Sequence, residues 1–309
     1  MDIGFGAPVS GAWASPQNLA AFATEAEDAG YHSLWSFQRL LVPSGSSMEP
    51  VYQSVLDPMA VLSYAAAVTS RIRLGVAIVN LPFVSPGYLA KQAASLDVLS
   101  GGRHDLGLGI GWMPEEFALT GADMASRGAR VTEYVRTLRT LWAGTVPTPV
   151  GGVYYEVPAG AQLPRPVQPG GPSVLLGGMA RPALQRVGRV ADGWITSSRT
   201  DLSRIGALIA VVRESAEAAG RDPGSLRVIC RGVVRVGEPV TGPEGQRVRL
   251  SGDYDQIRAD TEWLGEQGVT EVFYDLNWDP QVGAPEAPVD AATERAREIL
   301  HALAPGTSD

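Results

Sequence analysis

The sequence is poor in the side chains on which several common chemistries depend. Among its 309 residues are one cysteine, one lysine and three histidines, namely Cys230, Lys91, His32, His104 and His301. A single cysteine excludes an internal disulfide and a cysteine-based metal cluster. Schiff-base enzymes and P-loop proteins need a placed lysine, and Lys91 lies in an expected helix with no glycine-rich loop before it. The scattered histidines do not indicate a zinc site, so no metal is expected.

The chain also has no long apolar run and no excess of positive charge. No run approaches the roughly 20 apolar residues that a membrane helix needs, and the formal net charge is −8. Residues 1–5 hold an acid and no basic stretch, so we expect no secretory signal and a cytoplasmic location. An acidic chain of this kind favours neither a nucleic acid nor a membrane as partner. The expected partner is a small-molecule substrate.

What the sequence does contain is an alternation of strand and helix repeated eight times. Strands are expected at 3–7, 33–37, 72–79, 104–110, 173–176, 193–197, 226–236 and 271–276. A helix is expected after each strand, the helices beginning near residues 16, 57, 86, 114, 182, 202, 254 and 290. Three of these starts, Ser15-Pro16, Asp57-Pro58 and Ser85-Pro86, combine a side-chain acceptor with a proline, as the first turn of a helix prefers.

Eight such units predict an α/β fold, a closed (β/α)8 TIM barrel that forms a single domain over residues 1–309. The alternative is an open doubly wound sheet, which usually carries the pattern G-x-G-x-x-G after its first strand. Here Gly4-Phe5-Gly6 is followed by Ala7, Pro8 and Val9, so the third glycine is missing. The barrel is therefore the better prediction.

Three long connections interrupt the alternation. They follow strand two (40–56), precede strand five (144–172) and follow strand seven (237–252). The middle one is rich in proline and glycine, and residues 153–157 predict a short extra strand inside it. The first and third come after strand carboxyl ends, which form the catalytic face of a barrel, so they are candidate lids.

Two strand ends on the expected catalytic face suit an anion. Gly177, Gly178 and Met179 come just before a helix that is expected to start at Pro182, so free amides and the positive end of the helix dipole point outward. Ser197, Ser198 and Arg199 follow the neighbouring strand and add hydroxyls and a fixed cation. A tight turn would explain the glycines alone, but the two segments together predict a phosphate site.

Strand three ends in an apolar edge made of Ala77, Ile78, Val79 and Asn80. This edge can pack against a flat ring and Asn80 can hydrogen-bond the ring, although ordinary barrel core would give the same pattern.

After strand four, Trp112 comes before two acids, Glu115 and Glu116, at a helix start that suits their charge. A glycosidase would need a second carboxylate across a cleft, and neither Glu238 nor Asp275 is well placed for that.

Several segments together resemble the luciferase-like monooxygenase superfamily. They are LDVLSGGR at 96–103, GLGIGW at 107–112 with the acids at 115–116, RGAR at 127–130, LLGG at 175–178 and ADGW at 191–194. The resemblance runs from the first strand to the eighth, and the chain looks most like the actinobacterial branch that uses the deazaflavin coenzyme F420. It implies a TIM barrel, usually a homodimer, with the coenzyme ring at the strand carboxyl ends.

The resemblance also implies roles for the candidate residues. A non-proline cis peptide within 77–80 is expected behind the coenzyme ring, which places Ala77, Ile78, Val79 and Asn80 beside it. The coenzyme phosphate is expected on Gly177, Gly178 and Met179, with Ser197, Ser198 and Arg199 nearby. Glu115 matches a position that contacts the ring or its tail, and Trp112 takes a place where some sugar-phosphate-oxidising relatives carry an acid.

One departure from the family pattern concerns Gln38 and Arg39, which stand where many relatives have Asp-His. Arginine stays protonated and cannot act as a general base. Arg39 can stabilise negative charge on the reduced deazaflavin or hold an anionic substrate, or it can form a salt bridge under the long loop, with Glu49 as one partner. Gln38, Arg39 and Glu115 are the catalytic candidates, and Asn277 is a further candidate for polar contact. None of them is an evident proton donor.

The expected function is hydride transfer between coenzyme F420 and an unidentified small organic substrate. One alternative is an FMN-dependent, two-component monooxygenase of the same superfamily. Another is a cofactor-binding protein without catalytic activity. A hydrolytic barrel that binds no cofactor is a more distant third.

Overall fold

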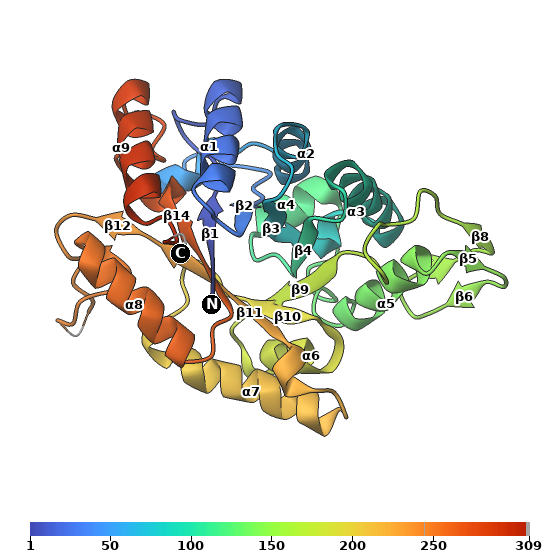
Figure 1. Ribbon diagram of the computed structural model, residues 1–309. Helices are drawn as coiled ribbons and strands as arrows, with labels where there is room; N and C mark the ends of the chain where they lie inside the picture. The colour runs from blue at the N-terminus through green and yellow to red at the C-terminus, as the bar shows by residue number, and fades with distance from the viewer. Residues whose placement is uncertain (244, 307–309) are drawn as a thin grey trace.

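The computed structural model describes residues 1–243 and 245–306. Its centre is a closed barrel of parallel strands in the order β1-β14-β11-β10-β9-β4-β3-β2 (Figure 1). The strands are β1 (Asp2–Gly6), β2 (Ser33–Ser36), β3 (Arg73–Asn80), β4 (His104–Gly109), β9 (Ser173–Gly177), β10 (Gly193–Ile195), β11 (Arg227–Val233) and β14 (Glu271–Asp275). The predicted TIM barrel is confirmed.

Helices surround the barrel (Figure 1). They are α1 (Pro16–Asp28), α2 (Pro58–Val68), α3 (Pro86–Ser100), α4 (Pro114–Thr120), α5 (Val131–Trp142), α6 (Arg181–Val190), α7 (Ile205–Ala218), α8 (Tyr254–Glu266) and α9 (Val289–Ala302). Single 3-10 turns are η1 (Pro50–Tyr52), η2 (Leu81–Phe83), η3 (Leu202–Arg204), η4 (Pro223–Ser225) and η5 (Leu276–Trp278). Among the described residues, none of these helices combines the length and the apolar character of a membrane span.

The predicted helix caps are confirmed. The Ser15 hydroxyl accepts from the amide of Asn18, the Asp57 carboxylate accepts from two amides of the first turn of α2, and the Ser85 hydroxyl accepts from the amide of Tyr88. Each cap satisfies backbone donors that a helix leaves free at its start. These caps determine where the helix begins in each of the first three strand–helix units.

The insertion before strand five forms two small antiparallel pairs that extend beyond α5 (Figure 1). Strand β5 (Thr145–Val146) pairs with β8 (Gly160–Ala161), and β6 (Val150–Gly151) pairs with β7 (Glu156–Val157). The strand expected at 153–157 is wrong for 153–155. The amides of these three residues donate to the Glu133 carboxylate at 3.0, 2.9 and 2.7 Å, so they form a turn.

The strand predicted at 226–236 is divided into two pieces. Strand β11 stays in the barrel as far as Val233, and β12 (Arg235–Val236) leaves it to pair with β13 (Ser251–Gly252). This side pairing brings together the two ends of the insertion that follows strand seven.

The barrel interior is layered, because alternate residues of a strand face the same side. The lowest layer is polar and holds Ser33, Arg73, Asp105, Arg227 and Glu271, which are joined by hydrogen bonds. The middle layer is apolar and holds Trp35, Ala77, Leu175, Ile195, Ile229 and Phe273. Two residues beyond Ile229 and Phe273 come Arg231 and Asp275, which form a buried ion pair at the carboxyl end of the barrel.

Candidate functional site

The loops after β9 and β10, where the phosphate site was predicted, lie in contact. The Met179 sulfur is 3.6 Å from the Ser197 hydroxyl and 3.4 Å from the Thr200 hydroxyl. The loop after β4 joins them, since the Arg199 guanidinium carbon lies 5.9 Å from the centre of the Trp112 ring. The structure therefore brings these three predicted segments to one side of the barrel mouth.

The glycine segment suits an anion on local geometry. Gly178 has φ of +130°, and a Cβ there would lie 2.8 Å from Cβ of Ala183, so only glycine fits. Helix α6 starts at Arg181, one residue before the predicted start, and its N-cap Ala180 offers no side-chain acceptor. Within the described residues, the amides of Gly178 and Met179 donate to no protein group. These free donors at a helix start match what a phosphate needs.

The Ser197–Arg199 segment is partly committed to its own turn. The Ser197 amide donates to the Thr200 hydroxyl at 3.0 Å, and the Ser197 hydroxyl accepts from the Arg199 amide at 3.3 Å. The Arg199 side chain is 63% exposed and lies 3.5 Å from the Glu49 carboxylate. The carboxylate partner of Arg199 is thus part of a surface ion pair, which contributes little and is readily exchanged for another anion.

The end of β3 has the predicted irregularity. The Ala77–Ile78 peptide is cis, and the register with β4 shifts between Val76 and Val79. The Asn80 amide donates to the Gln38 side-chain oxygen at 2.9 Å, so Gln38 braces this strand end. Val79 is 3% exposed and packs in the core between strands and helices, so only its backbone is available to a ligand.

Arg39 is buried and paired. Its guanidinium lies 3.0 Å from the Glu116 carboxylate, with the two side chains 6% and 1% exposed. It also lies 4.5 Å from the Tyr52 ring centre and 5.1 Å from that of Trp112. The suggestion of Glu49 as its partner is wrong, because Glu116 takes that place. A substrate held directly by Arg39 would first have to displace this buried ion pair.

The two neighbouring acids of α4 have different surroundings. Glu116 is buried and also accepts the Leu40 amide at 2.9 Å. Glu115 is exposed, and among the described residues its carboxylate has no ion-pair partner. Trp112, 53% exposed, precedes both acids at the mouth. Glu115 and Trp112 are therefore free to contact a ligand, as predicted for them.

Asn277 is a structural residue, which corrects its place among the candidates for polar contact. Its side-chain oxygen accepts from the amides of Val9 and Ser10 at 3.2 and 3.1 Å and from the Trp13 indole at 3.3 Å. Its side-chain nitrogen donates to the Ala7 carbonyl and to Asp275. The whole amide is used to join β14 to the loop after β1, so nothing is left for a ligand.

The main hollow at the mouth was not predicted as a whole. It measures about 720 Å³, and we call it the mouth cavity. Its lining includes Ser198, Trp278 and five arginines: Arg199, Arg231, Arg235, Arg247 and Arg249. One signal was present in the sequence, because Arg231 interrupts strand β11 directly after the apolar residues 228–230.

Both candidate lids line the mouth cavity. The first contributes Glu49, and the insertion after β11 contributes residues from Val240 to Ser251. The base of this second insertion is tied to α8 by Asp260, which accepts from Arg247, Arg249 and the Leu250 amide at 2.7 to 2.8 Å. Burial raises the pKa of Asp260, but these hydrogen bonds outweigh burial and hold it below its usual value.

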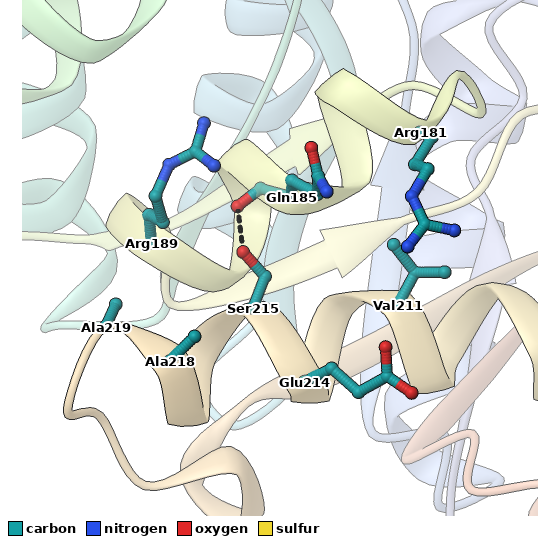
Figure 2. A pocket seen from close by; sticks show the side chains of 8 residues that line it. All are labelled: Arg181, Gln185, Arg189, Val211, Glu214, Ser215, Ala218 and Ala219. Carbon is teal, nitrogen blue, oxygen red and sulfur yellow. Dashed lines mark hydrogen bonds between the residues drawn. The ribbon is translucent and has the colours of Figure 1, made fainter.

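A second hollow lies outside the barrel, between α6 and α7 (Figure 2). It measures about 330 Å³, and Figure 2 shows its lining residues on the two helices, with Arg181, Gln185 and Arg189 on α6 and Glu214 and Ser215 on α7. The Ser215 hydroxyl donates to the backbone carbonyl of Gln185 at 2.8 Å, which joins the two helices. Because it lies between two outer helices, the mouth cavity is the better candidate site.

The described residues offer no ready metal centre and no activated thiol. No group of three or more His, Cys, Asp or Glu side chains among them could hold a metal ion. Burial raises the pKa of the Cys230 thiol to about 12, so the group stays protonated at neutral pH.

Comparison with known proteins gives consistent matches. The family model for luciferase-like monooxygenases matches residues 3–271. The F420-dependent glucose-6-phosphate dehydrogenase of Kineococcus radiotolerans is 31% identical over 216 residues, 69% of this chain and 62% of that protein. Two solved structures match over 98% of this chain and 98% of their own chains. Monooxygenase RslO1 from Streptomyces bottropensis has a TM-score of 0.78 and 22% sequence identity. The coenzyme F420-dependent tetrahydromethanopterin reductase from Methanopyrus kandleri has a TM-score of 0.76 and 18% sequence identity. At these identities the likeness to the two structures shows a shared fold.

Proposed function

The chain belongs to the luciferase-like monooxygenase family, and on this premise we propose that it is an oxidoreductase that uses coenzyme F420 to move a hydride to or from a small organic substrate. The observation that carries the proposal is the pair of free amides at Gly178 and Met179, next to the 197–200 turn that the Met179 sulfur contacts. The proposal also draws on the 31% identity with an F420-dependent dehydrogenase.

The residues at the mouth fit the parts of such a coenzyme. The amides of Gly178 and Met179, with the Ser198 hydroxyl and the Arg199 guanidinium, would hold the phosphate. The bulged end of β3, at Ala77 and Ile78, offers an apolar edge for the ring. When bound, F420 supplies the hydride chemistry at ring carbon 5.

The chain's own side chains would then orient and shield the reactants. Gln38 holds the backbone of the β3 end through the Asn80 amide. Arg39, paired with Glu116, lies against Trp112 and keeps a positive charge near the mouth. Glu115 is exposed at the same rim and is the proposed contact for the ring or its tail. In this assignment Arg39 acts through charge rather than as an acid or base.

A flavin-dependent monooxygenase is the second candidate. The fold neighbour RslO1 is a monooxygenase by name, and a phosphate cradle made of backbone amides suits FMN as well as F420. The two functions separate on the cofactor, because reduced deazaflavin has carbon in place of flavin nitrogen 5 and reacts poorly with oxygen.

The test is a fluorescence titration of the purified protein with F420 and, separately, with FMN. We expect micromolar binding of F420 and weaker binding of FMN. Arg199→Ala should weaken F420 binding about tenfold, as loss of a charge-assisted contact to phosphate does. The matched control is Arg136→Ala, an exposed arginine on α5.

Each other outcome redirects the proposal. Preferred binding of FMN, followed by oxygen uptake with reduced flavin, would establish the monooxygenase instead. Bound F420 that no donor or acceptor turns over would indicate a cofactor-binding protein without catalytic activity. Binding of neither cofactor would overturn the oxidoreductase assignment.

We propose also that the protein is a homodimer, as the family resemblance implies. Helices α2 and α3 pack against each other, and each carries large apolar side chains that are exposed. Tyr64 and Val68 of α2 are 44% and 37% exposed, and Tyr88 and Leu99 of α3 are 62% and 68% exposed. A second copy would cover side chains that water solvates poorly.

A further inference from the structure

We propose that the substrate carries an oxyanion, either a phosphate or a carboxylate, and that Arg235 binds this group in the mouth cavity. The inference rests on the proposed hydride transfer and names the class of substrate that the transfer would use. The lining of the cavity is rich in arginine, whereas the chain as a whole is acidic.

The lining of the mouth cavity is strongly cationic. Five arginines contribute to it, whereas the acids of the lining are Glu49 and Asp201. The Asp201 carboxylate already accepts from the amide and hydroxyl of Ser203 at 3.1 and 2.7 Å. A chain with a formal net charge of −8 thus gathers five arginines at this hollow, where a low-dielectric wall strengthens the field of any charge that stays unpaired.

Four of the five arginines have a carboxylate partner. Arg247 and Arg249 share Asp260, each at 2.7 Å. Arg231 pairs with Asp275 at 2.6 Å, and Arg199 contacts Glu49 at 3.5 Å.

Arg235 is the exception. Its side chain is partly buried, and within the described residues it has neither an ion-pair partner nor a side-chain hydrogen bond. A guanidinium partly withdrawn from water and lacking a partner gains most from an incoming anion.

Arg231 connects this end of the cavity with the proposed place of the coenzyme ring. It is 8% exposed and lies 4.5 Å from the Phe37 ring centre and 5.7 Å from that of Trp278. Its Nη1 reaches the carbonyl of Ala77, next to the cis peptide, at 3.4 Å. A substrate anchored at Arg235 and lying along Arg231 would therefore extend toward the bulged end of β3.

The Arg231 guanidinium is held by Asp275, one oxygen of which accepts from Nε at 2.7 Å and lies 2.6 Å from Nη2. Because this carboxylate already neutralises Arg231, Arg235 is the arginine that we propose to bind the oxyanion.

A variant of Glu49 should change anion affinity in the direction opposite to a variant of Arg235. It contacts Arg199, and it lines both the mouth cavity and a neighbouring hollow of about 110 Å³ in which Arg235 also lies. Its carboxylate therefore competes with an incoming anion for the same positive field. Removing its charge should tighten anion binding, and removing the charge of Arg235 should weaken it.

The experiment is calorimetric titration with inorganic phosphate and with acetate, at constant ionic strength, with and without saturating F420. Arg235→Gln should weaken binding of the preferred ion about tenfold or more. Glu49→Gln should strengthen it about two- to fivefold. Arg136→Gln, which makes the same change of charge on distant α5, should leave it unchanged. The preferred ion identifies the substrate group as phosphate or carboxylate.

Three results would overturn the inference: no binding of either ion at millimolar concentration, equal losses in Arg235→Gln and Arg136→Gln, or displacement of F420 by phosphate. Arg235→Gln should keep the wild-type unfolding midpoint, since the Arg235 side chain has no partner to lose among residues 1–243 and 245–306. Binding of F420 without either ion would refute the anion site and leave the proposed function standing. If the protein binds either ion through Arg235 but does not bind F420, the anion site stands and the proposed function is refuted.

Discussion

Glu115 and Glu116 show how differently two adjacent and identical side chains can be used. Both suit the start of α4 by charge, so the sequence does not separate them. The helix turns the Glu116 side chain inward with Phe117, where it meets Arg39, and leaves Glu115 at the rim. The pair therefore offers a matched comparison between a structural acid and a candidate ligand contact.

Glu116→Gln should destabilise the protein by about 3 kcal/mol, because it leaves the buried charge of Arg39 without a counterion. Glutamine can still accept the Leu40 amide, so the loss reports the charge. Urea unfolding followed by fluorescence measures the effect. Glu115→Gln, the control, should stay within about 0.5 kcal/mol of wild type. Equal stabilities of the two variants would contradict the assignment.

The same comparison reports on the proposed cofactor contact. If Glu115 meets the coenzyme, Glu115→Gln changes F420 affinity while stability is kept. A variant with unchanged affinity would remove Glu115 from the site and leave the phosphate cradle as it is.

Among single residues, those whose role depends on the local backbone could be predicted from the sequence. The side chains that pair with each other through packing could not. Gly177 and Gly178 could be found, because glycines before a proline-led helix have a local meaning. The pairing of Arg39 with Glu116 could not, since the two residues are far apart in the chain. For Asn277 the place of a polar side chain near a strand end was predictable, but the groups that it hydrogen-bonds were not.

At the scale of elements, the lowest layer of the barrel is a charge cluster shared by several strands. Asp105 of β4 is fully buried and accepts from Arg73 of β3 at 2.9 and 2.7 Å and from Arg227 of β11 at 2.7 and 3.2 Å. Burial raises the pKa of Asp105, but the two guanidiniums outweigh burial and lower it below the usual value. The carboxylate thus links strands that are not adjacent in sequence.

Asp105→Asn should cost about 3 kcal/mol of unfolding free energy at pH 7, because partly buried Arg73 loses its counterion and Arg227 keeps Glu271 alone. Asp28→Asn, which alters an exposed pair with Arg71, should cost less than about 1 kcal/mol.

The effect should also depend on pH. Because the pKa of Asp105 is lower in the folded than in the unfolded state, its contribution is complete above about pH 3.9, the usual Asp pKa. It is lost as the pH falls further, through the lowered folded value. The difference between wild type and Asp105→Asn in urea unfolding should therefore shrink toward pH 3. A difference that grows on acidification would contradict the linkage.

The regular elements were predictable because their signals are local. Ser15, Asp57 and Ser85 mark helix starts within one turn, and apolar runs mark the barrel strands. Of the two-residue strands, β7 and β12 lie inside segments predicted as strands, at 153–157 and 226–236, but their partners were not predicted. The turn at 153–155 depends on a distant group, the Glu133 carboxylate, which no local signal indicates.

At the scale of the whole molecule, the repeat of eight units was enough to predict the barrel and the face on which the site lies. The mouth cavity could not be predicted as a volume, since its wall combines η3, β11, β12 and two insertions. Charge shows the same limit: a net value of −8 conceals a cationic hollow.

The proposed homodimer makes a prediction for the whole molecule. Leu99→Glu on α3 should convert the dimer to a monomer, because a buried and unpaired carboxylate would be forced into the apolar contact. Light scattering coupled to size-exclusion chromatography measures the mass. Val153→Glu, at a position 86% exposed in the β6–β7 turn, is the control and should leave the mass unchanged. A monomeric wild-type protein would refute the proposal.

The insertion after β11 has a consequence for how the family can diversify. Its two ends are fastened to each other, with the Arg235 amide donating to the Leu250 carbonyl and the Gly237 amide to the Gly252 carbonyl, both at 3.0 Å. A segment whose ends are already joined can change length at little entropic expense, since loop closure depends only logarithmically on length. The stretch between Gly237 and Arg247 can therefore be exchanged between relatives, provided that Arg247 and Arg249 keep their contacts with Asp260. Such an exchange would change the wall of the mouth cavity, and with it the choice of the proposed substrate, and leave the barrel unchanged.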